Sequence, residues 1–266
     1  MLAQERQFLI IKQIMQRGTA YITDLAKEFG VSDETIRRDL LAICKEHPIR
    51  RVHGGAVAIK RPARDASYEE RSLQNLEAKQ KIGSYAAAQI YDNDVIFIDT
   101  GTATEALANA IFGIQNLKIL TNSIPVAHIL LKKLKNGDFT GNVLLIGGEA
   151  NPETESVSGP IATFLLERFF VDKAFIGATS VSKDGIMLWS ETEGMFTASL
   201  IKKAGETFVL AESEKFRKQS FYKVCGFFET LSIVTDDVTP IPNEITDALN
   251  NANTVISIVN IKTDKG

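Results

Sequence analysis

Several residue types and patterns are scarce in this 266-residue chain, and each scarcity narrows what the protein can be. Cysteine occurs only at Cys44 and Cys225, without the spacing of a metal site, so we expect two free thiols in a reducing compartment. No apolar run reaches the roughly 18 residues of a membrane span, and the first residues lack the pattern of a secretory signal. The sequence therefore predicts a cytoplasmic protein with no membrane anchor.

Metal and nucleotide motifs are also missing. The three histidines, His47, His53 and His128, are scattered, and no two of them have the i, i+4 spacing of a helical metal site, which argues against metal binding. Neither G-x-x-x-x-G-K-[ST] nor G-x-G-x-x-G occurs, so neither a nucleoside triphosphate nor a dinucleotide is indicated. We expect no cofactor.

Charge is distributed unevenly along the chain. Residues 1–61 hold 11 Lys and Arg against 7 Asp and Glu, whereas residues 62–266 hold 19 against 26. A small basic part joined to a larger acidic part suggests a polyanion-binding domain attached to a domain with another task.

The basic part has the pattern of a helix-turn-helix followed by a hairpin. Apolar residues at helical spacing end near Gly18, a second set covers 22–29, and GVS at 30–32 supplies a turn with Ser32 as the cap of a third helix. Around Gly54 and Gly55, residues 49–62 alternate as in a short hairpin, or wing.

The third helix and the wing carry the candidate DNA contacts. Ile36, Leu40 and Ile43 form its apolar face, which leaves Thr35 and Arg38 pointing away from that face and Arg37 on its flank. The N-terminal residues of such a helix read base edges in the major groove, while basic wing residues contact phosphates. The predicted DNA-binding set is Ser32, Thr35, Arg37, Arg38, Arg50, Arg51 and His53, with Lys60 and Arg61 as further phosphate contacts. The alternative is a three-helix packing element with a solvated basic rim.

The acidic part predicts an α/β domain with a parallel sheet. Near-continuous apolar strands alternate with helical patterns, as expected of a sheet covered on both faces. The expected strands are 94–99, 118–122, 142–147, 173–178, 207–212, 231–236 and 254–259. The helices expected between them are 77–91, 103–112, 123–135, 158–169, 191–204 and 243–251.

Polar and small residues follow several of these strands. DTGTATEAL at 99–107 places hydroxyls and glycine between a strand and a helix N-terminus, an arrangement that can bind phosphate or can simply form a tight turn. Ligands of parallel sheets lie outside the carboxyl ends of the strands. Taken together, the strand ends favour a pocket there, and Trp189, beside Glu191 and Glu193, is a candidate to line it.

Two strings at this spacing, TIRRDL (35–40) and RRVHGGAV (50–57), make the chain closely resemble the DeoR family of bacterial transcription regulators. The resemblance covers nearly the whole chain, through Lys79-x-x-Ile82, DTGTAT (99–104), TNS (121–123), GG (147–148), FIGA (175–178) and Lys215-Phe216. It implies a winged helix-turn-helix and a sensor domain. The expected bounds are 1–61 for the winged helix-turn-helix, 62–76 for a linker in which helix resumes from Tyr68, and 77–266 for an α/β sensor and oligomerisation domain. It also implies a sensor sheet like that of ribose-5-phosphate isomerase, and a phosphorylated sugar as effector.

The resemblance also implies effector-binding positions. Asp99, Gly101, Thr102 and Thr104 match the family's D-x-G-[ST]-T loop, in which Ala103 replaces a hydroxyl residue. Asn122, Gly148 and Lys215 match the other pocket positions. The family's D-S-S-K-F-G reads ESEKFR at 212–217, so a longer acid, an added carboxylate and a lost glycine bear on the shape or charge of the effector.

These observations predict a regulator of a sugar-catabolic operon that acts on double-stranded operator DNA as a homodimer or homotetramer. A repressor is favoured, and an activator is the alternative. One head buries only about 600–1,000 Å², too little for operator-level affinity. The alternative is a sugar-phosphate isomerase fused to a DNA-binding head. Its proton shuttle would be a carboxylate, for which Glu105, Glu191 and Glu193 are the candidates.

Overall fold

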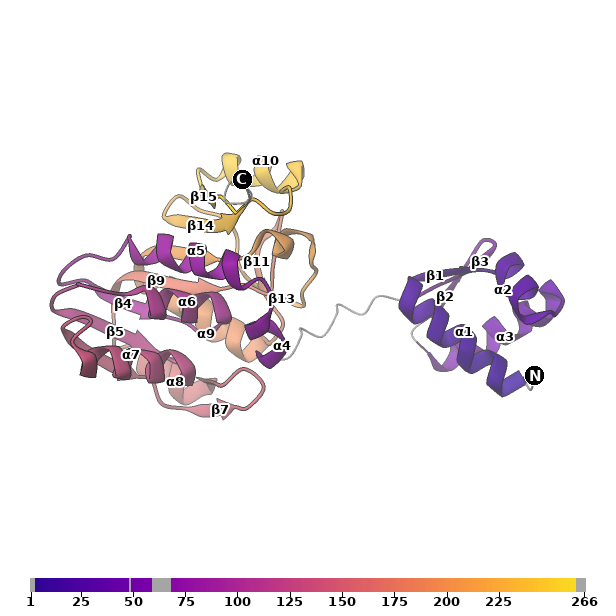
Figure 1. Ribbon diagram of the computed structural model, residues 1–266, viewed down its shortest axis with the longest axis horizontal. Coiled ribbons are helices and arrows are strands. Elements are labelled where there is room, and N and C mark those ends of the chain that lie inside the picture. Colours follow the sequence, from indigo (N-terminus) through magenta and orange to yellow (C-terminus); the bar gives the residue numbers. More distant parts are fainter. Residues whose placement is uncertain (1–2, 48, 59–67, 262–266) are drawn as a thin grey trace. The chain divides into compact units, whose positions relative to one another are not determined.

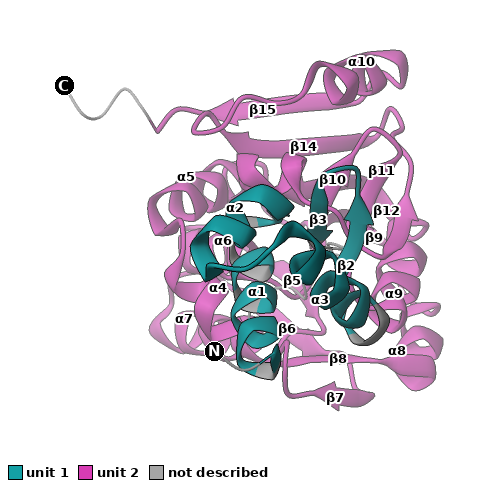
Figure 2. Ribbon diagram, turned by 90° about the vertical axis from the view of Figure 1, so that its right-hand side faces the viewer, with its two compact units in different colours: residues 1–63 teal, residues 64–266 magenta. Residues whose placement is uncertain are grey.

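The computed structural model describes residues 3–47, 49–58 and 68–261, in two compact units, Met1–Ala63 and Arg64–Gly266 (Figure 1, Figure 2). We call these the N-terminal and the C-terminal unit. No helix within the described ranges is long and apolar enough to cross a membrane.

The N-terminal unit contains the predicted helix-turn-helix and wing. Its elements are the helices α1 (Ala3–Arg17), α2 (Ile22–Phe29) and α3 (Asp33–Glu46) and an antiparallel sheet ordered β1 (Thr19–Tyr21), β3 (Gly55–Ala58), β2 (Ile49–Val52). Gly30 ends α2 with a φ of 64°, and the Ser32 side chain caps α3 by accepting a hydrogen bond from the Thr35 N–H. Ile36, Leu40 and Ile43 are buried in the unit's core, as the helical spacing predicts.

Strand β1 has no counterpart in the sequence prediction. It is three residues long, and its pairing partner β3 approaches it closely at Gly55, where a Cβ would lie 2.2 Å from the Ala20 carbonyl oxygen. Glycine at position 55 is therefore required for this pairing, in addition to any role in the wing turn.

A buried ion pair joins the first and third helices. The Arg6 Nε lies 2.6 Å from an Asp39 carboxylate oxygen, with the two side chains 9% and 5% exposed, and Gln7 donates to the other oxygen at 2.9 Å. Asp39 belongs to the TIRRDL string, so one acid of that string is a core residue and not a surface group.

The C-terminal unit is built on one seven-stranded sheet in which every neighbouring pair is parallel. In spatial order the strands are β15 (Val255–Val259), β14 (Leu231–Asp236), β12 (Ala204–Leu210), β9 (Val171–Gly177), β4 (Val95–Ile98), β5 (Leu117–Thr121) and β6 (Gly141–Leu145). Each lies within or close to a predicted strand, and together they confirm the parallel α/β class.

Helices cover both faces of this sheet (Figure 1). They are α5 (Leu76–Ala87), α6 (Thr102–Ala110) and α7 (Ile124–Asn136) on one face and α8 (Gly159–Leu166), α9 (Glu191–Ile201) and α10 (Asn243–Asn251) on the other. Along β4, Ile96 and Ile98 join the apolar cluster of the first face and Phe97 joins that of the second. Burial on both faces is the reason why the strands are continuously apolar.

Several short elements were not predicted. They are the hairpin β7 (Glu149–Asn151) and β8 (Ser156–Ser158), the antiparallel sheet β10 (Ser180–Ser182), β11 (Gly185–Leu188), β13 (Tyr222–Cys225), and the 3-10 helix η1 (Ser213–Arg217). Helix α4 (Tyr68–Leu73) begins where the sequence predicts that helix resumes, within the expected linker 62–76. Residues 62–67 of that linker lie outside the described residues. Elements of three to six residues are too short to carry a periodic apolar pattern.

Candidate functional site

The start of α3 presents polar side chains in a fixed arrangement. The Ser32 Oγ accepts from the Thr35 N–H at 3.3 Å and lies 2.9 Å from the Thr35 Oγ1, so the cap and the first-turn threonine are held together. Arg37 and Arg38 are exposed one turn further along. An exposed guanidinium beside a capped helix start suits insertion into a groove lined by acceptors.

The wing adds two more exposed arginines. In β2 only Ile49 is buried, and Arg50 and Arg51 are exposed, as is His53 in the turn. Helix α3 packs against β2, so the α3 arginines and the wing arginines belong to one small unit. Lys60 and Arg61, also predicted to contact phosphates, lie outside the described residues.

The second candidate site is a cavity of about 540 Å³ in the C-terminal unit. It lies at the carboxyl ends of β4, β9 and β12, where parallel sheets bind ligands, and its volume is typical of a small-molecule site. The lining residues are Tyr68, Glu69, Arg71, Thr100–Ala103, Asn151–Glu155, Gly177–Thr179, Leu188–Ser190, Glu193, Leu210, Glu212 and Lys215.

One wall of the cavity is the N-terminus of α6. Gly101 has a φ of 147°, which glycine adopts without strain, and the Thr104 hydroxyl donates to the Gly101 carbonyl at 2.7 Å. The first N–H groups of a helix have no acceptor within the helix, so this end of α6 attracts an anion. Gly101 and Thr102 line the cavity, whereas the Thr104 side chain is buried and supports the loop.

Asp99 and Asn122 lie beneath this loop. The Asp99 carboxylate accepts hydrogen bonds from the Thr197 hydroxyl and the Thr100 N–H, both at 2.8 Å, and from the Asn122 side chain. Burial raises the pKa of Asp99 to about 6, against these three hydrogen bonds, which lower it, and with a small further increase from the Glu193 charge. Asp99 therefore positions the loop and does not line the cavity.

Glu193 attaches the hairpin β7–β8 to α9 and lines the cavity. Its Oε1 accepts from the Thr154 hydroxyl at 2.7 Å, the Ser156 hydroxyl at 3.2 Å and the Asn151 amide at 3.3 Å. Three donors on one oxygen hold this carboxylate in one orientation.

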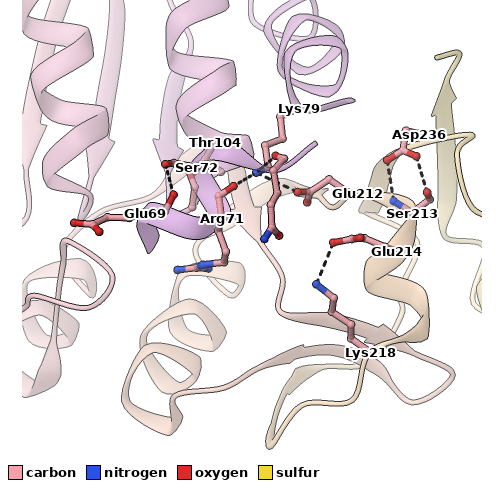
Figure 3. Close-up of polar contacts among 12 residues, drawn as sticks. Glu69, Arg71, Ser72, Lys79, Thr104, Glu212, Ser213, Glu214, Lys218 and Asp236 are labelled. Carbon is pink, nitrogen blue, oxygen red and sulfur yellow. Dashed lines mark hydrogen bonds and ion pairs between the residues drawn. The ribbon is translucent and has the colours of Figure 1, made fainter. Parts of the chain in front are cut away.

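Buried charges form another part of the lining, and Figure 3 shows Glu212 among them, next to Lys79. Lys215, on η1, lines the cavity and is only 7% exposed. Glu212 lines it too, and its Oε1 lies 3.5 Å from the Nζ of Lys79, with the two side chains 9% and 4% exposed. The same Nζ donates to the Gln74 carbonyl at 2.7 Å and to the Arg71 carbonyl, as Figure 3 shows in part.

The predicted effector-binding residues thus have three kinds of location. Gly101, Thr102 and Lys215 line the cavity, and Asp99, Thr104 and Asn122 are buried. Gly148 is exposed between β6 and β7, outside the lining, where a Cβ would lie 2.7 Å from the Ser158 carbonyl oxygen.

The predicted effector-binding set omitted the residues of α4 and of the β7–β8 turn. In sequence the only signal for that turn is the Asn151–Glu155 run of turn-forming and acidic residues after a Gly pair. Of the three carboxylates considered for isomerase chemistry, Glu193 lines the cavity, Glu191 is exposed, and Glu105 accepts a hydrogen bond from the Tyr68 hydroxyl. Burial raises the pKa of Glu105.

Comparison with known proteins identifies the family. Residues 6–62 match the DeoR-like helix-turn-helix domain, and residues 74–237 match the DeoR C terminal sensor domain. The HTH-type transcriptional regulator IolR of Bacillus subtilis is 31% identical over 238 residues, 89% of this chain and 92% of that protein. The lactose phosphotransferase system repressor of Streptococcus mutans is 32% identical over 234 residues, 88% of this chain and 92% of that protein.

Among solved structures, ribose 5-phosphate isomerase A from Methanocaldococcus jannaschii is 16% identical over 53% of this chain and 55% of that chain, with a TM-score of 0.37. A similarity of that extent does not bear on activity. The two domain matches, by contrast, identify the family, and so do the two regulators, because each regulator aligns over most of both chains. The chain belongs to the DeoR family of transcriptional regulators.

Proposed function

We propose that this protein is a DNA-binding repressor of a sugar or carbohydrate catabolic operon and that a phosphorylated sugar controls it. In this proposal residues 1–61 bind double-stranded operator DNA, and residues 77–266 bind the effector and oligomerise. The linker expected at 62–76 is shortened, because α4 (Tyr68–Leu73) contributes Tyr68, Glu69 and Arg71 to the cavity and so belongs to the effector-binding part. The lactose phosphotransferase system repressor among the relatives supports a role in sugar metabolism.

The DNA-binding part of the proposal assigns α3 to the major groove. Thr35 and Arg38 read base edges there, and an arginine paired with guanine is worth about 1–3 kcal/mol of discrimination. Arg37, Arg50, Arg51 and His53 contact the backbone, and Ser32 holds the helix start. The exposure of all four arginines supports these assignments.

The observation that carries the effector assignment is the cavity at the strand ends. It combines the N-terminus of α6 with the cation of Lys215, both suited to a phosphate, and it contains carboxylates such as Glu193, suited to sugar hydroxyls. Asp99, Thr104 and Asn122 act in this proposal as the support of the phosphate-binding loop. Gly148 acts through its backbone, since a side chain at that position has no room.

We propose further that the protein does not catalyse isomerisation. A proton shuttle needs a carboxylate that reaches the substrate carbons. Glu105 is bonded to Tyr68, Glu193 holds the hairpin through three donors, and Glu191 is exposed. Each candidate therefore has a structural role or lies at the surface.

We assign the protein to the cytoplasm, where bacterial operator DNA lies, and to a homodimer or homotetramer. Exposed apolar side chains support assembly: Ile161 and Phe164 on α8 are 62% and 57% exposed, and Leu144 and Leu145 are exposed on the edge strand β6. Light scattering of the full chain tests this assignment, and a monomeric mass at micromolar concentration would contradict it.

The experiment that tests the proposed function combines three measurements on the full chain. Trp189, the only tryptophan, lines the cavity, so its fluorescence should report the binding of phosphorylated sugars. We expect saturable binding, a changed affinity for one genomic DNA fragment, and no product. Turnover of a phosphosugar would instead favour the isomerase, and absence of any preferred DNA fragment would contradict the repressor.

A lysine pair sharpens this test. Lys215→Met should abolish the fluorescence response while DNA binding persists, because it removes one of the cavity's cations. Lys218→Met is the matched control, since Lys218 is exposed, pairs with Glu214 at 3.1 Å and does not line the cavity. Equal responses of the two variants would place the effector elsewhere.

A further inference from the structure

Helix α4 is held to the C-terminal unit by polar contacts and not by a buried apolar face. It spans the six residues Tyr68–Leu73, none of them buried. It is also the first described element after residues 59–67, the segment that connects the two units in sequence. A short helix without buried side chains gains little from packing, so its stability depends on a few specific contacts.

Those contacts lie at its two ends. At the start, the Tyr68 hydroxyl donates to the Glu105 Oε1 on α6. At the end, the Lys79 Nζ donates to the carbonyls of Arg71 and Gln74 and lies 3.5 Å from the Glu212 Oε1 (Figure 3). An ammonium group has three donors, and a cation at the C-terminal carbonyls of a helix is favourable.

Both attachments connect α4 to elements that form the cavity. Glu105 lies on α6, whose N-terminus is one wall, and Glu212 is part of another wall. Helix α4 itself contributes Tyr68, Glu69 and Arg71 to the lining. In Figure 3 the Arg71 side chain points away from Lys79, so its backbone and its guanidinium have different surroundings.

Carboxylates outnumber cations in the cavity lining, so each cation matters for binding an anion. Among the described lining residues five are carboxylates, namely Glu69, Glu153, Glu155, Glu193 and Glu212. Only Arg71 and Lys215 are cations within the same described lining. An anionic group entering a space with this balance is repelled by most of the walls and attracted towards these two residues.

We propose that Arg71 contacts the anionic group of the bound ligand, and that α4 is thereby the element through which occupancy of the cavity reaches the segment leading to the N-terminal unit. This inference rests on the proposed function, because it takes the ligand to be a phosphorylated sugar. The ligand bridges Arg71 on α4 and Lys215 on η1, and it favours the docked position of α4. A ligand with equal affinity for docked and undocked α4 would transmit nothing.

The test measures occupancy and the state of α4 separately, on the full chain. Trp189 fluorescence follows binding of ribose 5-phosphate, glucose 6-phosphate, fructose 1-phosphate and inorganic phosphate, with ribose as the uncharged control. Hydrogen exchange of the backbone amides of residues 68–76 follows α4. In the unsubstituted protein, a phosphorylated sugar that saturates the Trp189 signal should slow this exchange about tenfold or more, and ribose should not.

Two substitutions test different steps: one removes the Arg71 contact with the ligand, and the other removes the attachment through which binding affects α4. Arg71→Met should weaken binding of that phosphosugar about tenfold to a hundredfold, the range for a hydrogen bond to a charged group. Arg217→Met is its matched control, because Arg217 is exposed, donates to the Pro240 carbonyl and does not line the cavity. Lys79→Met should abolish the slowed exchange of residues 68–76 at saturating ligand, since α4 loses its C-terminal attachment. Because docking and binding are coupled, it should also weaken binding, by no more than Arg71→Met does.

Lys79→Met leaves Glu212 buried without its partner and can unfold the protein, so Lys79→Arg is the second variant, expected to retain both binding and slowed exchange. The inference is overturned if a phosphosugar saturates the Trp189 signal without changing exchange at 68–76, or if Arg71→Met binds it like Arg217→Met. A Trp189 signal that responds to none of the phosphosugars contradicts the proposed function itself, and the inference fails with it.

Discussion

The two units use charge in opposite ways. In the N-terminal unit the arginines of α3 and β2 are exposed on a small apolar core. In the C-terminal unit Lys79, Asp99, Glu212 and Lys215 are all less than 10% exposed. Glu212 and Lys215 line the cavity, and Lys79 and Asp99 contact residues that line it. Exposed cations suit a large polyanion. Salt screens each exposed contact and makes it weak, so the affinity has to come from many such contacts along the polyanion. Buried charges suit a small ligand, because each interaction is stronger away from water.

The contrast is not complete in either unit. In the N-terminal unit the Arg6 and Asp39 side chains are buried and join α1 to α3. In the C-terminal unit many charges are exposed, among them Glu191 at the start of α9. If these surroundings determine the energetics, substitution of a buried, paired charge should cost more free energy than substitution of an exposed one.

The largest effect is expected at Asp39. Asp39→Ala leaves the Arg6 guanidinium buried without its carboxylate, which should lower the free energy of unfolding of the N-terminal unit by about 3–5 kcal/mol. Hydrogen exchange of the α3 amides in the full chain measures this loss. The control is Asp33→Ala, an exposed acid in the first turn of the same helix, for which we expect at most about 1 kcal/mol. Similar losses in both variants would contradict the assignment of Asp39 to the core.

The next effect concerns the pH dependence produced by Asp99. Its pKa is about 6 in the folded protein and about 3.9 in an unfolded chain. Between these values the folded state retains a proton that the unfolded state has lost. The free energy of unfolding should therefore decrease as the pH rises from about 4 to 6, by on the order of 3 kcal/mol.

Asp99→Asn removes this group and should flatten that part of the stability curve. Urea unfolding followed by Trp189 fluorescence at several pH values gives the difference between variant and unsubstituted protein. Subtraction cancels the contributions of other acids, such as Glu105. A difference that does not vary between pH 4 and 6 would show that the Asp99 carboxyl is hydrated.

The exposed arginines should have smaller effects that differ in kind. Arg38→Ala should weaken binding of the preferred DNA fragment by about 1–3 kcal/mol, with little loss on random DNA. Arg50→Ala should weaken both about equally and lower the slope of log affinity against log salt by about 1. Fluorescence anisotropy at several salt concentrations measures both quantities. Equal loss on both DNAs for Arg38→Ala would show that Arg38 contacts only phosphate.

The smallest effect is expected at the cap of α3. Ser32→Ala removes the acceptor of the Thr35 N–H and should destabilise the helix start by about 1 kcal/mol. Ser32→Asn keeps a capping oxygen without adding charge and should restore most of the loss. Exchange of the first α3 amides distinguishes the two variants. If both exchange alike, the cap contributes nothing measurable.

Much of the fold could be predicted because long elements have long patterns. The seven apolar runs and the helices between them gave the parallel sheet, and the Gly30–Ser32 turn gave the helix-turn-helix. The elements that could not be predicted are short. Strand β1 depends on the close approach of Gly55 to Ala20, and the hairpin β7–β8 depends on hydrogen bonds to Glu193 from α9.

The cavity was predicted in part for the same reason. Gly101, Thr102 and Lys215 follow strands in sequence, so the rule for parallel sheets locates them. The hairpin and α4 complete the cavity from positions that are distant from those strands along the chain. No spacing rule connects Arg71 with Lys215, although both line one space.

The sequence alone determined which kinds of surface this protein has: apolar periodicity specifies the helices and the strands buried on both faces, and the uneven charge separates a basic head from an acidic body. Only the tertiary structure decided which charges are exposed and which are buried. That difference depends on contacts between distant segments, as with Asp39 and Arg6 or Glu212 and Lys79, because burial is a property of what packs around a residue and not of its neighbours in the chain.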